Sequence, residues 1–157
     1  MTARQVGDVP GAAMASNAYI ASLNDPLDEK DVRNVEQLAF SSKDTVFVFM
    51  TKHSDKFIRV LGERKFQMDI MNMIYTGVIE PMREAHKSWD EIEAVTKVHG
   101  APGEQIFLRA KVIESLNQKD WNVYIPAATS YLGKYGDKLK PEERSMFQSA
   151  LDQAKSN

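Results

Sequence analysis

The stretch that decides the fold is ERKFQMDIMNMIYTGVIEPMREAH, residues 63–86. Its large apolar side chains cover most of a helical circumference, a pattern typical of a helix in the middle of a bundle. Only Asp69, Asn72 and Thr76 share a narrow polar stripe, at spacings i, i+3 and i+7. Pro81 has no backbone N–H, so we expect it to kink or end this helix.

The segment before this helix contains the one run whose residue types favour a β-strand, TVFVFMT at residues 45–51. A strand needs a hydrogen-bonding partner, and no second run of this kind occurs in the chain. Asp44 and the serines before it supply a helix start signal. We therefore expect a buried helix here, followed by another that Ser54 caps and Gly62 ends.

The N-terminal residues 1–24 predict a loose arm with a weak helix near residues 12–23, because glycine and proline interrupt the start of the chain. Asn-Asp-Pro at 24–26 then breaks the chain. Acidic residues at 28–31 lead into a short amphipathic helix, where carboxylates are favourable at the positive end of the helix dipole. The sequence thus predicts one helical domain over residues 25–157.

Ser88 and Glu91 form the pattern of a capping box, which predicts the start of the next helix. Gly100 suits the end of that helix, because glycine readily adopts the left-handed conformation found there. The GAPG stretch at residues 100–103 is the most suitable place in the sequence for an internal boundary.

Two further helical patterns follow, and only residues 117–120 separate them. So short a connection predicts an antiparallel helical hairpin near the C-terminus, similar in form to a tetratricopeptide hairpin but without its repetition. Pro126 should bend the second helix or delay its start. Pro141 suits the first turn of a last helix. The predicted fold class is therefore all-α, a single helical bundle that includes this hairpin.

The composition excludes several classes of function. The 157 residues are 43 % hydrophobic and 27 % charged, an ordinary globular balance. Twenty basic and 22 acidic residues leave a formal net charge of −2, which is no signature of nucleic-acid binding. The absence of cysteine excludes disulfides, thiolate nucleophiles and cysteine metal sites. No stretch approaches the ~20 apolar residues of a transmembrane helix, so we expect no membrane insertion.

The three histidines, His53, His86 and His99, are not spaced as metal ligands on one helix face. Each falls near the predicted C-terminus of a helix, where an imidazolium is stabilised by the helix dipole, and this explanation is favoured over a metal or catalytic role. The acidic clusters fall in predicted first turns, where carboxylates stabilise a helix without any catalytic duty. We therefore expect no enzymatic activity, no bound metal and no cofactor.

Binding functions are favoured by two features of the sequence. Five of the eight methionines lie within residues 50–82. Methionine is an ordinary filler of helical cores, but it also lines adaptable apolar sites. If this chain were a carrier of a small apolar ligand, a cavity should open beside Met68, Met71 and Met82.

The second feature is the surplus of aromatic residues in the predicted hairpin. Tyr135 continues the line of Trp121 and Tyr124, whereas Tyr131 is about 40° off that line and is expected to be partly exposed. Tyrosines at a rim often contact a partner protein, so Tyr131 and Tyr135 are the candidate partner surface. The expected function is a non-catalytic interaction or accessory module, with the carrier as the alternative.

SKDTVFVFMTKHSDKFIRVLG, residues 42–62, resembles the segment that follows the thioredoxin-like domain in a group of bacterial thioredoxin-family proteins. KDWNVY at 119–124 and KYG at 134–136 resemble the later helical hairpin of those proteins. The resemblance spans roughly residues 35–150 and implies a helical accessory region. It implies the periplasmic side of the cell envelope if the start was trimmed, and the cytoplasm is expected otherwise. Since the chain has no Cys-x-x-Cys, no redox activity is carried over.

Overall fold

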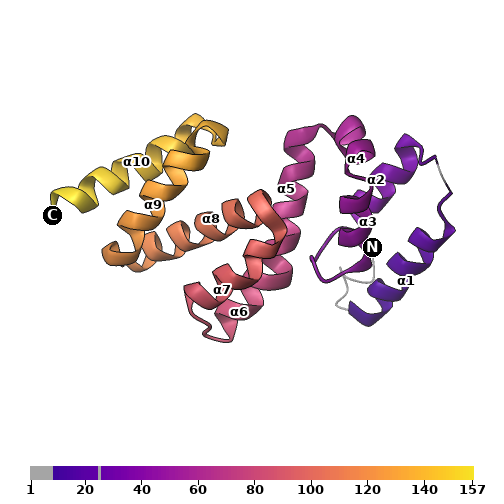
Figure 1. The fold of residues 1–157 in the computed structure, drawn as a ribbon, viewed down its shortest axis with the longest axis horizontal. Helices are drawn as coiled ribbons and strands as arrows, with labels where there is room; N and C mark the ends of the chain where they lie inside the picture. The colour runs from indigo at the N-terminus through magenta and orange to yellow at the C-terminus, as the bar shows by residue number, and fades with distance from the viewer. Residues whose placement is uncertain (1–8, 25) are drawn as a thin grey trace. The chain divides into compact units, whose positions relative to one another are not determined.

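A computed structural model describes residues 9–24 and 26–157, and among these it contains helices and no strand (Figure 1). The predicted all-α class is therefore confirmed. The chain divides into two compact units, unit 1 (Met1–Pro81) and unit 2 (Met82–Asn157), where the sequence predicts a single bundle. The predicted loose arm falls largely on residues 1–8, which lie outside the described residues.

The division falls after Pro81 and not at residues 100–103. Gly100 has a positive φ of 65°, as a helix stop requires, but it is also the first residue of helix α8. Gly103 serves close packing, because a Cβ at this position would lie 3.0 Å from the His99 Cβ and would overlap the Thr96 carbonyl. These glycines therefore tighten a turn inside unit 2 and do not form a linker.

Unit 1 consists of short helices followed by one long helical stretch that continues past the boundary. The elements are α1 (Val9–Ser22), α2 (Glu29–Gln37), α3 (Thr45–Lys52), α4 (Ser54–Leu61), α5 (Glu63–Ile74), the π-helix η2 (Tyr75–Ile79) and α6 (Glu80–Glu84). The weak helix expected near residues 12–23 corresponds to α1, and the amphipathic helix after residue 28 corresponds to α2.

The strand-like run at residues 45–51 is helical, as predicted, and forms α3 with Val46, Phe47 and Met50 buried. Tertiary burial of these side chains outweighs their local β-preference. Ser54 begins α4 but makes no capping hydrogen bond, so its predicted capping role is wrong. Gly62 ends α4 with a φ of 87°, and its N–H donates to the Ile58 carbonyl.

The long helix does not end at Pro81. It changes from α5 to the π-helix η2, in which the Glu80 N–H donates to the Tyr75 carbonyl five residues earlier, and it then continues as α6. In a regular α-helix the Pro81 ring would clash with the carbonyl of Gly77. The π-helical turn at this point is wider, so the helix can continue through the proline without this clash.

Unit 2 contains α7 (Trp89–Thr96), the 3₁₀-helix η3 (Lys97–His99), α8 (Gly100–Gln118), α9 (Trp121–Tyr135), the 3₁₀-helix η4 (Gly136–Lys138) and α10 (Pro141–Ser156). The capping box of Ser88 and Glu91 starts α7 as predicted. Helices α8 and α9 form the predicted hairpin, and Lys119 makes the tight turn with a φ of 55° (Figure 1). Pro126 lies inside α9 without delaying its start.

Tyr124, Tyr131 and Phe147 are the largest fully buried side chains of unit 2. Helix α10 packs against α9, and the Tyr124 hydroxyl donates to the Phe147 carbonyl at 2.8 Å. None of the helices within the described residues combines the length and the apolarity needed to cross a membrane.

Candidate functional site

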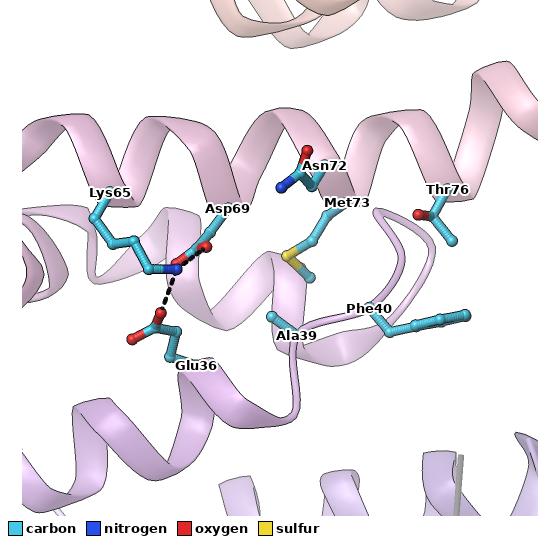
Figure 2. Close-up of a pocket in the computed structure, with 8 residues that line it drawn as sticks. All are labelled: Glu36, Ala39, Phe40, Lys65, Asp69, Asn72, Met73 and Thr76. Atoms are coloured by element: carbon cyan, nitrogen blue, oxygen red, sulfur yellow. Dashed lines mark hydrogen bonds and ion pairs between the residues drawn. The ribbon is translucent and has the colours of Figure 1, made fainter. Parts of the chain in front are cut away.

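A pocket of about 270 Å³ opens in unit 1 beside α5 (Figure 2). Helix α2 and the loop after it form one side, and α5 with the start of η2 forms the other. We call it the α5 pocket, and its lining residues are Glu36, Ala39, Phe40, Lys65, Asp69, Asn72, Met73 and Thr76. The polar stripe that the sequence shows on this helix therefore faces a pocket.

Three charged side chains meet in the α5 pocket. The Lys65 Nζ lies 2.7 Å from Glu36 Oε1 and 2.6 Å from Asp69 Oδ1, and Figure 2 shows this ammonium between the two carboxylates. The Asp69 side chain is only 12 % exposed, whereas that of Lys65 is 54 % exposed. Two carboxylates and one ammonium give the lining a formal charge of −1 when all three are ionised.

Asp69 is the least satisfied member of this group. Its Oδ2 atom is buried and accepts no hydrogen bond from the described residues. Burial raises the pKa of the Asp69 carboxyl above its ordinary value of 3.8, although the hydrogen bond from Lys65 acts in the opposite direction. The pKa of Lys65 is raised, chiefly by its hydrogen bonds to Asp69 and Glu36. Buried acceptors normally have a donor, so the Asp69 Oδ2 atom lowers stability, and because it is buried a molecule in the pocket does not reach it.

The loop wall of the pocket is held against the helix at the π-helical turn. The Met73 carbonyl, just before this turn, accepts a hydrogen bond of 2.8 Å from the Ser42 N–H. Gly77 permits the contact because a Cβ there would lie 2.6 Å from the Ser41 Oγ and 2.8 Å from the Ser42 nitrogen. The loop that carries Phe40 is thereby fixed at the pocket. π-Helical turns occur frequently at functional sites.

Exposed apolar side chains lie at one edge of the pocket and on the neighbouring face of the helix. Phe40, at the edge of the pocket, is 46 % exposed, and Met68 and Tyr75 are also exposed. Met68, Asn72 and Tyr75 follow each other at i, i+4 and i+7, which places the two apolar residues beside the pocket residue Asn72 on one helix face. We call Phe40, Met68 and Tyr75 the apolar rim.

The two tyrosines predicted as a partner surface are core residues. Tyr131 is 0 % exposed, so the expectation that it is partly exposed is wrong, and Tyr135 is buried at 8 %. Helix α10 is the reason, because the Phe147 ring packs on Tyr131 with centroids 6.0 Å apart. The Tyr135 hydroxyl donates to Glu104 Oε1 at 2.8 Å. Burial raises the pKa of both tyrosines to about 12.

The histidines lie at helix ends, as predicted. His53 follows α3, His86 follows α6 with a φ of 57°, and His99 ends η3. Burial lowers the pKa of His99, so this imidazole is less readily protonated than an exposed one. The described part of the chain contains no group of three or more His, Cys, Asp or Glu residues placed to hold a metal ion.

The α5 pocket does not lie where the carrier hypothesis places its cavity. That hypothesis expects Met68, Met71 and Met82 in the lining, whereas the one methionine that lines the pocket is Met73. Most of the other lining side chains are polar or charged. An apolar ligand would therefore meet ionised groups in this pocket.

Sequence reasoning identified the stripe of Asp69, Asn72 and Thr76 but did not assign it to a site. It missed Glu36 and Phe40, which come from the other wall. One signal was present, because Lys65 lies four residues before Asp69 and extends the stripe by one turn. No family model matches this chain, and neither a curated protein nor a solved structure matches it.

Proposed function

We propose that this chain is a non-catalytic helical module that binds another protein, and that unit 1 contacts the partner through the α5 pocket and the apolar rim. The observation that carries the proposal is that exposed Phe40 lines a charged pocket while exposed Met68 and Tyr75 lie beside it on the helix face of Asn72. Aromatic residues and methionine are enriched in protein interfaces. Polar groups at the same surface supply orientation and specificity.

The size of the pocket supports a protein partner over a cofactor. Its volume of about 270 Å³ is at the lower limit of small-molecule sites, which range over about 300–1,000 Å³. A pocket of this size suits one side chain of a partner that also covers the rim. The resemblance of residues 42–62 to a segment after a thioredoxin-like domain agrees with an accessory role. The sequence shows no nucleophile and base at a recognised spacing, which supports a non-catalytic module.

Site-specific photo-crosslinking in the source cell tests this proposal. A photoreactive amino acid replaces Phe40, Met68 or Tyr75 in three separate variants. Val48 is the matched control, because it is an exposed apolar residue of unit 1 that does not line the pocket. We expect the three rim positions to give a covalent adduct with the same defined protein, and position 48 to give none.

Two outcomes contradict the proposal. Equal yields of adduct from position 48 and from the rim would show that crosslinking at this surface is non-specific. An absence of protein adducts, together with an apolar molecule that co-purifies with the chain, would favour the carrier hypothesis instead.

A further inference from the structure

We infer that the α5 pocket receives an arginine side chain of the partner, an inference that rests on the proposed function. The charge of the pocket favours a cation. Lys65 already places one cation between the carboxylates of Glu36 and Asp69. With all three groups ionised, the lining still has a formal charge of −1. A second cation therefore complements the pocket, and an anion does not.

The hydrogen-bonding groups of the pocket favour a guanidinium. The carboxylates of Glu36 and Asp69 line the pocket, and the Lys65 ammonium lies within hydrogen-bond distance of one oxygen of each. Asn72 and Thr76 add side-chain oxygens to the same lining. A guanidinium offers five N–H donors and no acceptor, so it matches a site that presents several oxygens. A partner's lysine would add only a compact ammonium, the group that Lys65 already supplies.

An aromatic ring at the edge of the pocket also suits an arginine side chain. Phe40 lines the pocket and remains 46 % exposed. Figure 2 shows the ring directed away from the Glu36 and Asp69 carboxylates, so it can cover the apolar stem of an arginine whose guanidinium lies at these carboxylates. The ring lies on the loop that the Ser42–Met73 hydrogen bond holds in place, so the backbone of this loop needs little ordering when the partner binds.

NMR titration of the full ¹⁵N-labelled chain with acetyl-Leu-Arg-Leu-amide tests the inference. The matched peptide contains citrulline, which has the shape of arginine without its charge. We expect the arginine peptide to shift the amide signals of Lys65, Asp69 and Asn72. We expect the citrulline peptide to bind at least about tenfold more weakly, because a hydrogen bond to a charged group is lost.

Variants of the protein locate the effect. Asp69→Asn should weaken the arginine peptide about tenfold, whereas Asp55→Asn removes one charge from an exposed position of unit 1 and should not. Glu36→Gln is the second pocket variant if Asp69→Asn fails to fold. Equal binding of the two peptides, shifts confined to other residues, or no shifts at about 10 mM peptide would overturn the inference.

The two proposals fail differently. If crosslinks from the apolar rim persist while the pocket variants and the citrulline peptide have no effect, the interaction surface stands and the arginine inference is wrong. If the rim gives no adduct, the proposed function fails, whatever the peptide does.

Discussion

At the residue scale, two buried side-chain oxygens have no hydrogen-bond partner among the described residues: Asp69 Oδ2 and the Tyr131 hydroxyl. They lie in different surroundings. Asp69 lines an open pocket with a carboxylate that bears charge, and Tyr131 lies in the closed core of unit 2 with a phenol that burial keeps neutral. The other oxygen of Asp69 pairs with Lys65 at the pocket, whereas the unsatisfied Tyr131 phenol only lowers stability.

Asp69→Asn should alter the free energy of unfolding in a pH-dependent way. The pKa of Asp69 is raised in the folded protein, so the folded state binds this proton more tightly than the unfolded chain. The stability it contributes therefore grows as the pH falls from the raised pKa towards 3.8 and is absent at neutral pH. The attraction to Lys65 is weakened by solvent because Lys65 is half exposed.

We expect the Asn variant to be more stable than the parent by about 0–1 kcal/mol at pH 7, and this advantage to shrink as the pH falls. Urea unfolding of both proteins at pH 7 and near pH 4 measures the difference. Comparing the two proteins removes the contribution of Glu104, whose pKa is lowered by Lys134 and Tyr135 and which acts in the opposite sense. A loss of more than about 1 kcal/mol at pH 7 would show that the ion pair outweighs burial.

Two tyrosine-to-phenylalanine substitutions on α9 should differ in effect. Tyr124→Phe removes the buried hydrogen bond to the Phe147 carbonyl and should cost about 1–2 kcal/mol. In Tyr131→Phe, the lost hydroxyl has no partner among the described residues, so stability should change by less than about 0.5 kcal/mol or increase. Urea denaturation of the two variants tests this. Equal losses would indicate that Arg109, which lowers the Tyr131 pKa, makes a stabilising contact.

At the element scale, the π-helix η2 affects both the course of the long helix and the shape of the α5 pocket. It lets the long helix continue through Pro81, and it lies beside the carbonyl that holds the loop after α2. The same turn therefore accommodates Pro81 in the helix and positions a wall of the α5 pocket. Gly77 is the residue on which this arrangement depends, because any side chain would meet Ser41 and Ser42.

Gly77→Ala should destabilise unit 1 by about 1–3 kcal/mol, because the added Cβ forces the loop away from the helix. Gly133→Ala is the matched control. Gly133 is an exposed residue of α9 with nothing within 4 Å of an added Cβ, so alanine should stabilise by about 0.5–1 kcal/mol. Chemical denaturation of both variants measures the opposite signs. A stabilising Gly77→Ala would mean that the loop moves away without cost.

At the scale of the whole molecule, the chain has two cores. Unit 1 buries Val35, Phe57 and Ile74 without solvent exposure, and unit 2 buries Tyr124 and Tyr131 in the same way. Arg83, just after the boundary, pairs with Glu114 and stacks on the Trp89 ring at 4.2 Å, so the end of α6 belongs to unit 2.

A fragment of residues 80–157 should therefore fold without unit 1. We expect a helical circular dichroism spectrum and a cooperative thermal transition, although a fragment this short is marginal in the surface it buries. Phe147→Ala in the fragment should remove about 3–5 kcal/mol, since Phe147 is buried in the unit 2 core, and should abolish the cooperative transition. A helical spectrum without a cooperative transition in the parent fragment would show that unit 2 depends on unit 1.

Local pattern determined most of the elements of this protein. Some features depend only on neighbours a few residues away, so the sequence predicts them directly. They are the capping box at Ser88, the helix stop at Gly62 and the short turn before Trp121. The all-α class followed because a lone strand-like run has no partner with which to form a sheet.

Tertiary contacts decided the rest. Three contacts join residues that are far apart in sequence. Helix α10 covers Tyr131, Lys65 pairs with Glu36, and the loop after α2 packs against Gly77. A helical pattern shows which face of a helix is apolar, but it does not show what packs on that face. Burial and pocket formation depend on the three-dimensional approach of other elements, and for this reason the hydroxyl expected at a surface lies in a core and the polar stripe of α5 lines a pocket.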